Sequence, residues 1–218
     1  MRSRSGARRG PRGTRAKIAT PRGRRRARAA TSGASGRART RSAARANGSA
    51  PIREPVRILF VDVDGTLTDG AVAFNADGDG RSFYIRDGIA LQWARDEGVN
   101  TVVISGRGSK AVEGRMRDLD LEFYLGAEDK VDVARQVLER ERVDWNVCVM
   151  IGDDLPDVPL MKRVGWPIAV GDAHPEVKRI AKTVTAAPGG RGAVREAVER
   201  ILRHNGSWHR VLERYGAG

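Results

Sequence analysis

Continuous runs of apolar residues recur along the chain and alternate with segments whose apolar positions have helical spacing. The strongest runs lie at 58–61, 101–104 and 147–151, and shorter ones lie at 123–125 and 168–170; the β-branched segment Thr-Val-Thr at 183–185 is expected to form another short strand. An apolar run of this length without alternation is typical of a strand that is buried on both faces. Helices are expected at 89–97, 130–142 and 175–182, and another after 107. Strands that alternate with helices predict a Rossmann-like α/β fold, a parallel sheet with helices on both faces.

A β-hairpin is also expected beside this sheet. Residues 71–74 and 82–85 are largely apolar, and they flank 75–80, which is rich in Gly and Asp. Because these residue types favour tight turns, the pattern predicts two paired strands that project as a flap. The helix at 89–97 follows and is expected to end at Gly98, since glycine is a common helix stop.

Charge is distributed unevenly along the 218 residues, whose formal net charge is +13. The first 50 residues hold 16 of the 40 Lys and Arg residues but no Asp, Glu or aromatic residue. Such a segment cannot bury a hydrophobic core. We therefore expect three parts: a disordered Arg-rich extension at 1–50, a globular domain at 51–205 and a helical tail at 206–218.

Several interpretations of the Arg-rich extension stay open. Its composition is that of a nucleic-acid-binding arm or an organelle transit peptide. It would also arise from a start site assigned too far upstream in a GC-rich gene, with Val56 as the true initiator, and disorder without a dedicated function is favoured. The sequence has neither the apolar segment of a secretory signal nor a run of about 18 apolar residues that could span a membrane. We therefore expect a soluble, cytoplasmic protein.

The strand at 58–61 ends in the sequence DVDGT at 62–66. Because side chains alternate along a strand, Asp62 and Asp64 point the same way, and two carboxylates suit a magnesium ion. One aspartate can attack phosphorus to form an aspartyl-phosphate, and the other can protonate the leaving alcohol and then activate water. Gly65 allows the backbone to turn tightly beneath a phosphate. Taken alone, the motif is equally compatible with a solvated turn.

Polar residues follow two other predicted strands in the same way. Ser105 follows the strand at 101–104, and the sequence GDDLPD follows at 152–157. In parallel α/β sheets, ligands bind beyond the carboxyl ends of the strands, so these segments are expected to meet at one edge of the sheet. Each residue has a structural alternative: Ser105 could cap the next helix, Lys130 could be a surface charge, and Asp153 could lie in a turn.

This order of an aspartate pair, a serine, a lysine and an acidic loop resembles the haloacid dehalogenase superfamily. The resemblance implies that Asp62 is the nucleophile and Asp64 the general acid and base. It also implies that Ser105 and Lys130 bind the phosphoryl oxygens, where a fixed hydroxyl and ammonium stabilise developing charge. Mg²⁺ is the implied cofactor, in a metal site made by Asp62, the Asp64 backbone carbonyl and Asp153, with Asp157 as support.

A closer resemblance is to the capless 3-deoxy-D-manno-octulosonate 8-phosphate phosphatases. It is carried by DVDGTLTDG (62–70), FYIRDG (83–88), DAHP (172–175) and GGRGAVRE (189–196), and residues 67–104 leave no room for a cap domain. It implies a sugar phosphate substrate, a step in lipopolysaccharide biosynthesis, and a homotetramer in which a neighbouring subunit covers each active site. The implied substrate contacts are Asp64, Arg86, Asp87, Gly88, Arg107, Arg115 and Lys130.

Two positions depart from that family's pattern. Gln92 stands where the family has a substrate-binding Arg, and Arg81 stands where Lys is usual. Since Arg binds a carboxylate through two hydrogen bonds, its loss at 92 leaves open another acidic sugar phosphate, such as a nine-carbon ulosonate 9-phosphate. Two alternatives of a different kind also stay open: a nucleic-acid-binding protein that uses the basic extension, and a catalytically silent oligomeric relative.

The remaining candidate residues offer little chemistry. Cys148 is the only cysteine, which excludes an intramolecular disulfide, and it is expected to be a buried hydrophobe. His174 precedes Pro175 and is expected to cap a helix or pack in a loop. His204 and His209 lie in the C-terminal region without the spacing of metal ligands.

Overall fold

The structure is a computed structural model that describes residues 17–18, 52–75 and 78–218. Seven strands in this part of the chain form one parallel sheet in the order β1-β6-β5-β2-β7-β8-β9. Their bounds are β1 (Lys17–Ile18), β2 (Ile58–Val61), β5 (Asn100–Ser105), β6 (Glu122–Leu125), β7 (Cys148–Gly152), β8 (Trp166–Ala169) and β9 (Thr183–Val184). Apart from β1, the predicted extension at 1–50 lies outside the described residues.

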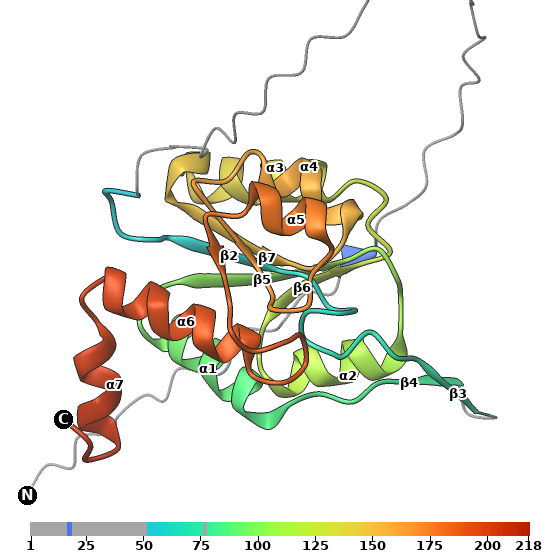
Figure 1. Ribbon diagram of the computed structural model, residues 1–218, viewed down its shortest axis with the longest axis horizontal. Helices are drawn as coiled ribbons and strands as arrows, with labels where there is room; N and C mark the ends of the chain where they lie inside the picture. The colour runs from blue at the N-terminus through green and yellow to red at the C-terminus, as the bar shows by residue number, and fades with distance from the viewer. Residues whose placement is uncertain (1–16, 19–51, 76–77) are drawn as a thin grey trace, which may run out of the picture.

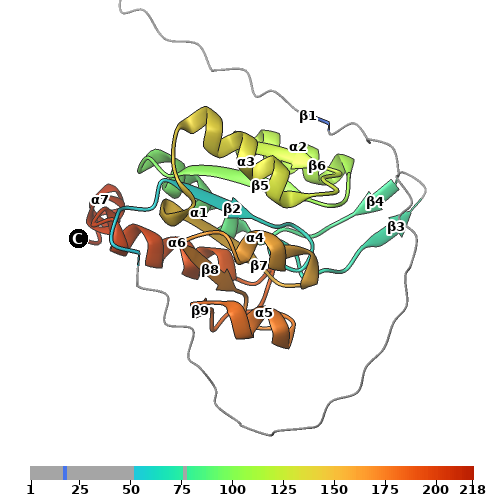
Figure 2. The ribbon, with the colours of Figure 1, turned by 90° about the horizontal axis from the view of Figure 1, so that it is seen from above.

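Helices cover both faces of the sheet (Figure 1). One face carries α1 (Ile85–Asp96), α2 (Lys110–Asp118) and α6 (Ala193–His204), and the other carries α3 (Lys130–Glu141), α4 (Val158–Met161) and α5 (Pro175–Ile180). Viewed from above, the projecting hairpin lies at one end of the molecule and the C-terminus at the other (Figure 2). The arrangement confirms the predicted α/β class.

The centre of the sheet is β2, which lies between β5 and β7. All four of its residues, 58–61, are at most 1 % exposed, because helices cover both sides of the strand. This is the physical reason for the uninterrupted apolar run in the sequence. Cys148 at the start of β7 is fully buried, as predicted, and burial raises the pKa of its thiol to about 12.

The predicted hairpin is present, but its second strand is shifted. It consists of β3 (Ala73–Asn75) and β4 (Gly78–Gly80), paired in antiparallel fashion. The prediction of a strand at 82–85 and of a helix start at Ile89 is wrong, because α1 already begins at Ile85. Gly88 obscures this start, since glycine weakens a helical pattern, yet a β-carbon at Gly88 would lie 2.4 Å from Nη2 of Arg115 in α2. Any larger residue at 88 would therefore have to displace the end of the Arg115 side chain.

Asp87 in the first turn of α1 holds the start of α6. Its Oδ2 accepts a hydrogen bond from the Gly192 amide at 3.1 Å, and its Oδ1 accepts one from the Arg195 amide at 2.7 Å. These amides belong to the helix start, where backbone donors have no partner within the helix. The side chain is buried, and burial raises its pKa. Asp87 thus joins two helices that are more than a hundred residues apart in the sequence.

Replacement of Asp87 by Ala is expected to lower the free energy of unfolding by about 2 kcal/mol, because it leaves two partly buried amides without an acceptor. Asp87→Asn keeps one acceptor oxygen and is expected to lose about half as much. Urea unfolding measures the stability of both variants, provided that the dependence of the free energy of unfolding on urea concentration is the same as in the wild type. Equal stability of Asp87→Ala and the wild type would contradict the capping role.

The C-terminal region forms the predicted helix, α7 (Trp208–Arg214). Glu97, after the end of α1, makes ion pairs with Arg210 at 2.6 Å and with Arg214 at 2.9 Å. The indole nitrogen of Trp93 donates to the hydroxyl of Tyr215 at 3.1 Å. These contacts attach α7 to α1. Within the described ranges, no helix is both long and apolar enough to cross a membrane.

Candidate active site

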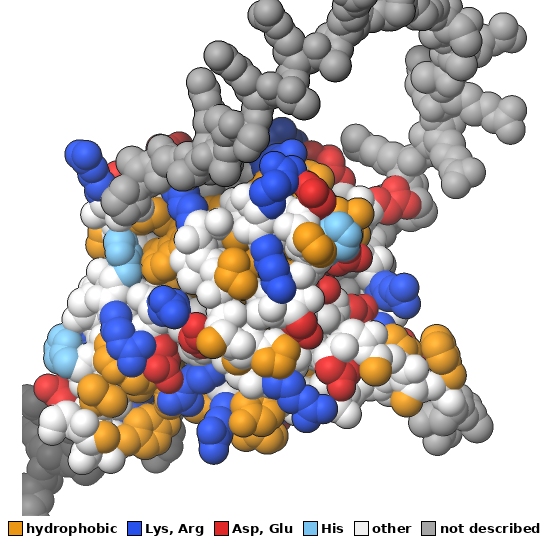
Figure 3. All heavy atoms as spheres, viewed as in Figure 1, with side chains coloured by type: hydrophobic (Ala, Val, Ile, Leu, Met, Phe, Trp, Pro, Cys, Tyr) orange, Lys and Arg blue, Asp and Glu red, His pale blue; other side chains and the backbone are white. Residues whose placement is uncertain are grey.

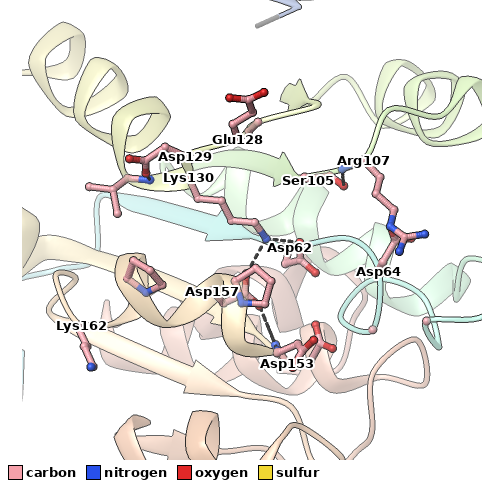
Figure 4. A pocket seen from close by; sticks show the side chains of 18 of the residues that line it. Asp62, Asp64, Ser105, Arg107, Glu128, Asp129, Lys130, Asp153, Asp157 and Lys162 are labelled. Carbon is pink, nitrogen blue, oxygen red and sulfur yellow. Dashed lines mark hydrogen bonds and ion pairs between the residues drawn. The ribbon is translucent and has the colours of Figure 1, made fainter. Parts of the chain in front are cut away.

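A cavity of about 1000 Å³ opens at the carboxyl edge of the sheet. The segments that follow β2, β5 and β7 all contribute to its lining, as predicted. The predicted residues that line it are Asp62, Asp64, Ser105, Arg107, Lys130, Asp153 and Asp157. Figure 4 shows their side chains gathered around the end of β2.

Lys130 lies at the centre of this group. Its Nζ is 2.5 Å from Oδ1 of Asp62 and 2.6 Å from Oδ1 of Asp157, and all three side chains are buried. Lys130 is the first residue of α3, which starts here because the Asp129 side chain accepts hydrogen bonds from the amides of Val131 and Asp132. Burial lowers the pKa of Lys130, but the two carboxylates outweigh it and raise the pKa above its usual value. Lys130 is therefore a fixed, buried cation rather than a surface charge.

Asp157 organises the loop after β7. While its Oδ1 contacts Lys130, its Oδ2 accepts hydrogen bonds from the amides of Asp153 at 3.0 Å and Asp154 at 3.4 Å. A β-carbon on Gly152 would lie 2.4 Å from this carboxylate, so only glycine admits it. Both oxygens of Asp157 are occupied, which supports its predicted role as a support for the metal site.

Three carboxylates lie close together in the cavity. When ionised, they carry more negative charge than the single positive charge of Lys130 can neutralise. One oxygen each of Asp62, Asp153 and Asp157 lies within 4.8 Å of the others. Burial, and then the neighbouring Asp157, raise the pKa of Asp62 to about 8 and that of Asp153 to about 6. A divalent cation would remove this excess, and clustered carboxylate oxygens are the donors that Mg²⁺ prefers. The donor set therefore fits Mg²⁺.

The backbone beneath the aspartate pair is held by a distant segment. Gly65 has φ +93°, and a β-carbon there would lie 2.1 Å from Asp153. A β-carbon on Gly189 would lie 1.8 Å from the Gly65 carbonyl oxygen, and the Gly190 amide donates to the Thr66 carbonyl at 2.9 Å. The segment at 189–190 thus packs directly against the loop that carries Asp62 and Asp64.

Comparison with known proteins shows to which family this chain belongs. Residues 127–196 match the haloacid dehalogenase-like hydrolase family. The 3-deoxy-D-manno-octulosonate 8-phosphate phosphatase of Escherichia coli K12 is 37 % identical over 155 residues, which cover 70 % of this chain and 82 % of that protein. The chain belongs to this phosphatase family of haloacid dehalogenase-like hydrolases.

Solved structures of family members agree with this placement. The phosphatase from Moraxella catarrhalis, in complex with a magnesium ion, a phosphate ion and a KDO molecule, has a TM-score of 0.71 at 30 % identity, covering 73 % of this chain and 93 % of that one. The phosphatase from Yersinia pestis has a TM-score of 0.69 at 35 % identity, covering 71 % and 84 %.

The family resemblance implies further substrate contacts, and several of these residues lie outside the cavity of the single chain. Arg86 lines a different hollow, between α1, α6 and α7. Both oxygens of Asp87 bind amides at the start of α6, and its expected substrate contact stays a prediction. Arg115 pairs with Asp118 at 2.7 Å and packs on Gly88. Within one chain, the side of the fold made by α1, α2 and α6 contains all four of these positions: Arg86, Asp87, Gly88 and Arg115.

The structure also answers two of the structural alternatives. The residue that precedes α2 as its N-cap is Ser109 rather than Ser105, and the Ser105 hydroxyl accepts a hydrogen bond from the Arg107 amide at 3.2 Å. His174 does cap a helix, since its Nδ1 accepts from the Glu176 amide at the start of α5. Ser105 is therefore free of a capping role for α2 and faces the cavity.

The sequence indicated no partner for Arg81, which the structure places directly beside Asp64. Its Nε is 2.5 Å from Oδ1 of Asp64, and its Nη2 is 3.3 Å from Oδ2. The Arg81 side chain is only 1 % exposed. In the sequence Arg81 was notable only for standing where Lys is usual in the family, and a lone Arg after a turn gives no signal of a contact with the catalytic loop.

Proposed function

We propose that this chain is a Mg²⁺-dependent phosphomonoesterase that hydrolyses 3-deoxy-D-manno-octulosonate 8-phosphate, a step in lipopolysaccharide biosynthesis. The observation that carries the proposal is the Lys130 ammonium held between Asp62 and Asp157 in the cavity at the sheet edge. The names of its relatives in Escherichia coli and Moraxella catarrhalis support the choice of substrate. Gln92 keeps a nine-carbon ulosonate 9-phosphate as the alternative substrate.

In the proposed reaction, a carboxylate oxygen of Asp62 attacks the phosphorus. The bond between phosphorus and the sugar oxygen breaks as an aspartyl-phosphate forms, and the Asp64 carboxyl gives its proton to that oxygen. Asp64 then takes a proton from water, which attacks the phosphorus and releases phosphate from Asp62. In this proposal Lys130 and Ser105 bind the phosphoryl oxygens and stabilise their charge in both transition states.

Asp62, Asp153 and the backbone carbonyl of Asp64 are the groups proposed to hold Mg²⁺. When bound, this ion would neutralise charge on the phosphate and on the clustered carboxylates. Thr66 keeps Asp153 oriented for this role, since its hydroxyl donates to Oδ1 of Asp153 at 3.0 Å.

Release of inorganic phosphate from three substrates tests the proposal. They are the octulosonate 8-phosphate, a nine-carbon ulosonate 9-phosphate and glucose 6-phosphate, each with Mg²⁺ and with excess chelator. We expect the octulosonate to be turned over selectively and the chelator to abolish the reaction. Preference for the nine-carbon compound would keep the mechanism and assign the altered specificity to Gln92. Absence of turnover on all three would refute the proposal.

A homotetramer in the cytoplasm is also proposed. The hairpin of β3 and β4 extends beyond the main sheet, where two strands alone are only marginally stable in water. Phe74 on the hairpin is 83 % exposed, and Figure 3 shows hydrophobic side chains gathered there. Association of hairpins from several subunits would cover them. Sedimentation as a stable monomer at micromolar concentration would contradict the proposed tetramer.

A contact between nucleic acid and residues 1–50 stays a prediction.

A further inference from the structure

Arg81 is a buried cation that the proposed reaction does not use. It lies just after β4, and its guanidinium reaches the end of β2, where it makes two contacts with the Asp64 carboxylate. A planar guanidinium with two donors on one carboxylate fixes both the position and the rotation of that carboxylate. Asp64 lines the cavity whereas Arg81 does not. Arg81 therefore does not contact the cavity directly, and Asp64 is the cavity residue to which it is bound.

A second carboxylate holds Arg81 in this place. Its Nη1 is 2.5 Å from Oδ2 of Asp79 in β4, and the other oxygen of Asp79 accepts a hydrogen bond from the Ser109 hydroxyl at 3.1 Å. Ser109 directly precedes α2. A continuous chain of polar contacts thus runs from the start of α2 through the hairpin to Asp64. With both carboxylates bound, the guanidinium has little freedom to move away.

We propose that Arg81 is a positioning residue, which holds the Asp64 carboxyl in line with the leaving oxygen and with the attacking water. The inference rests on the proposed phosphatase function. It assigns no bond-making step to Arg81 itself. It predicts that loss of Arg81 slows each step of the reaction to the extent that the step depends on proton transfer by Asp64.

Leaving groups of different basicity separate this role from a general structural one. A sugar alkoxide needs a proton to depart, whereas p-nitrophenolate departs readily without one. For Arg81→Met we expect the first step to slow about 100-fold with the octulosonate 8-phosphate and to change far less with p-nitrophenyl phosphate. The second step needs Asp64 as a base for either substrate. Rapid mixing with p-nitrophenyl phosphate should therefore reveal a burst of one p-nitrophenolate per site, as the aspartyl-phosphate accumulates.

Three variants complete the experiment. Arg81→Lys keeps the charge but loses the two-donor geometry, so we expect partial rescue. Arg117→Met removes an exposed arginine that pairs with Glu113 on α2, and it is expected to behave as the wild type. Asp79→Asn weakens the second anchor of Arg81 and should show a smaller version of the same leaving-group dependence, which keeps the test available if Arg81→Met does not fold.

Two results for Arg81→Met would overturn the proposal. One is an equal slowing of the first step with both substrates and no p-nitrophenolate burst, and the other is no slowing with either substrate. A folded Arg81→Met/Asp64→Asn double variant should be no slower than Asp64→Asn alone, because both changes act through one group. An inactive wild type would instead refute the phosphatase function itself. The two failures are therefore distinguishable.

Discussion

Replacement of Asp62 by Asn is expected to abolish phosphate release while stabilising the metal-free fold. An amide cannot form the aspartyl-phosphate, so we expect turnover to fall by about 10⁴-fold or more, as for other covalent nucleophiles. Asp62 is buried beside Asp157 and Asp153, and its pKa is raised from 3.8 to about 8. The neutral amide occupies the same space without the cost of burying a third carboxylate.

The stabilisation has a defined dependence on pH. Between about pH 4 and 8 the unfolded chain has lost the Asp62 proton while the folded chain keeps it, so the stability that this proton contributes is lost as the pH rises towards 8. Asn has no proton to lose. The variant should therefore gain stability relative to the wild type as the pH rises, reaching about 1–3 kcal/mol at pH 8 without Mg²⁺.

Thermal unfolding with chelator at pH 6 and pH 8 measures this effect, and a phosphate assay measures the turnover. Asp132→Asn is the matched control, because Asp132 is 57 % exposed on α3 and should change neither quantity appreciably. Turnover by Asp62→Asn at a few per cent of the wild-type rate would show that another group attacks phosphorus. Loss of stability at pH 8 would show that the Lys130 contact outweighs the cost of burying the charge.

Replacement of Lys130 by Met is expected to change stability in the opposite direction. Methionine fills similar space, but it leaves the carboxylates of Asp62 and Asp157 buried without their shared cation. Removal of one partner from a buried ion pair typically costs about 3–5 kcal/mol. We expect this loss at pH 8 without Mg²⁺, and a smaller loss at pH 6, where Asp62 takes up a proton and the repulsion falls.

Turnover of Lys130→Met should fall by about 10²–10³-fold, since a fixed positive charge at the transferring phosphoryl group is lost. Lys162→Met is the control at the exposed rim of the same cavity. The double variant Asp62→Asn/Lys130→Met should recover part of the lost stability, because the two changes share one contact. Unchanged stability of the single Lys130→Met variant, measured by urea unfolding, would show that the contact contributes nothing to the fold.

Much of the site was predictable because its residues occupy positions that local patterns define. Asp62, Ser105 and Asp153 follow three apolar runs, and parallel strands bring their carboxyl ends to one edge. Lys130 begins the helix that the pattern predicted at 130–142. In each case a few neighbouring residues decide the element, and the geometry of a parallel sheet then decides where its end lies.

The partners of charged residues were not predictable in the same way. Asp87 was expected to contact substrate, yet it binds amides at the start of α6, 105 and 108 residues further along the chain. Arg81 lies 17 residues from Asp64, and nothing in the sequence between them marks the contact. Gly189 supports Gly65 from the far end of the domain. Each of these pairs depends on how helices and loops pack after the sheet has formed.

The hydrophobic pattern of the chain is sufficient to define the buried strands, the helices between them and the edge at which the carboxylates gather. That pattern is local, since burial on one face or both imposes a period on neighbouring residues. The conformation of the hairpin, the early start of α1 and the fixation of Asp64 by Arg81 required the tertiary structure. A charged side chain can satisfy its hydrogen bonds with many groups, and only packing in three dimensions selects which of them lies within reach.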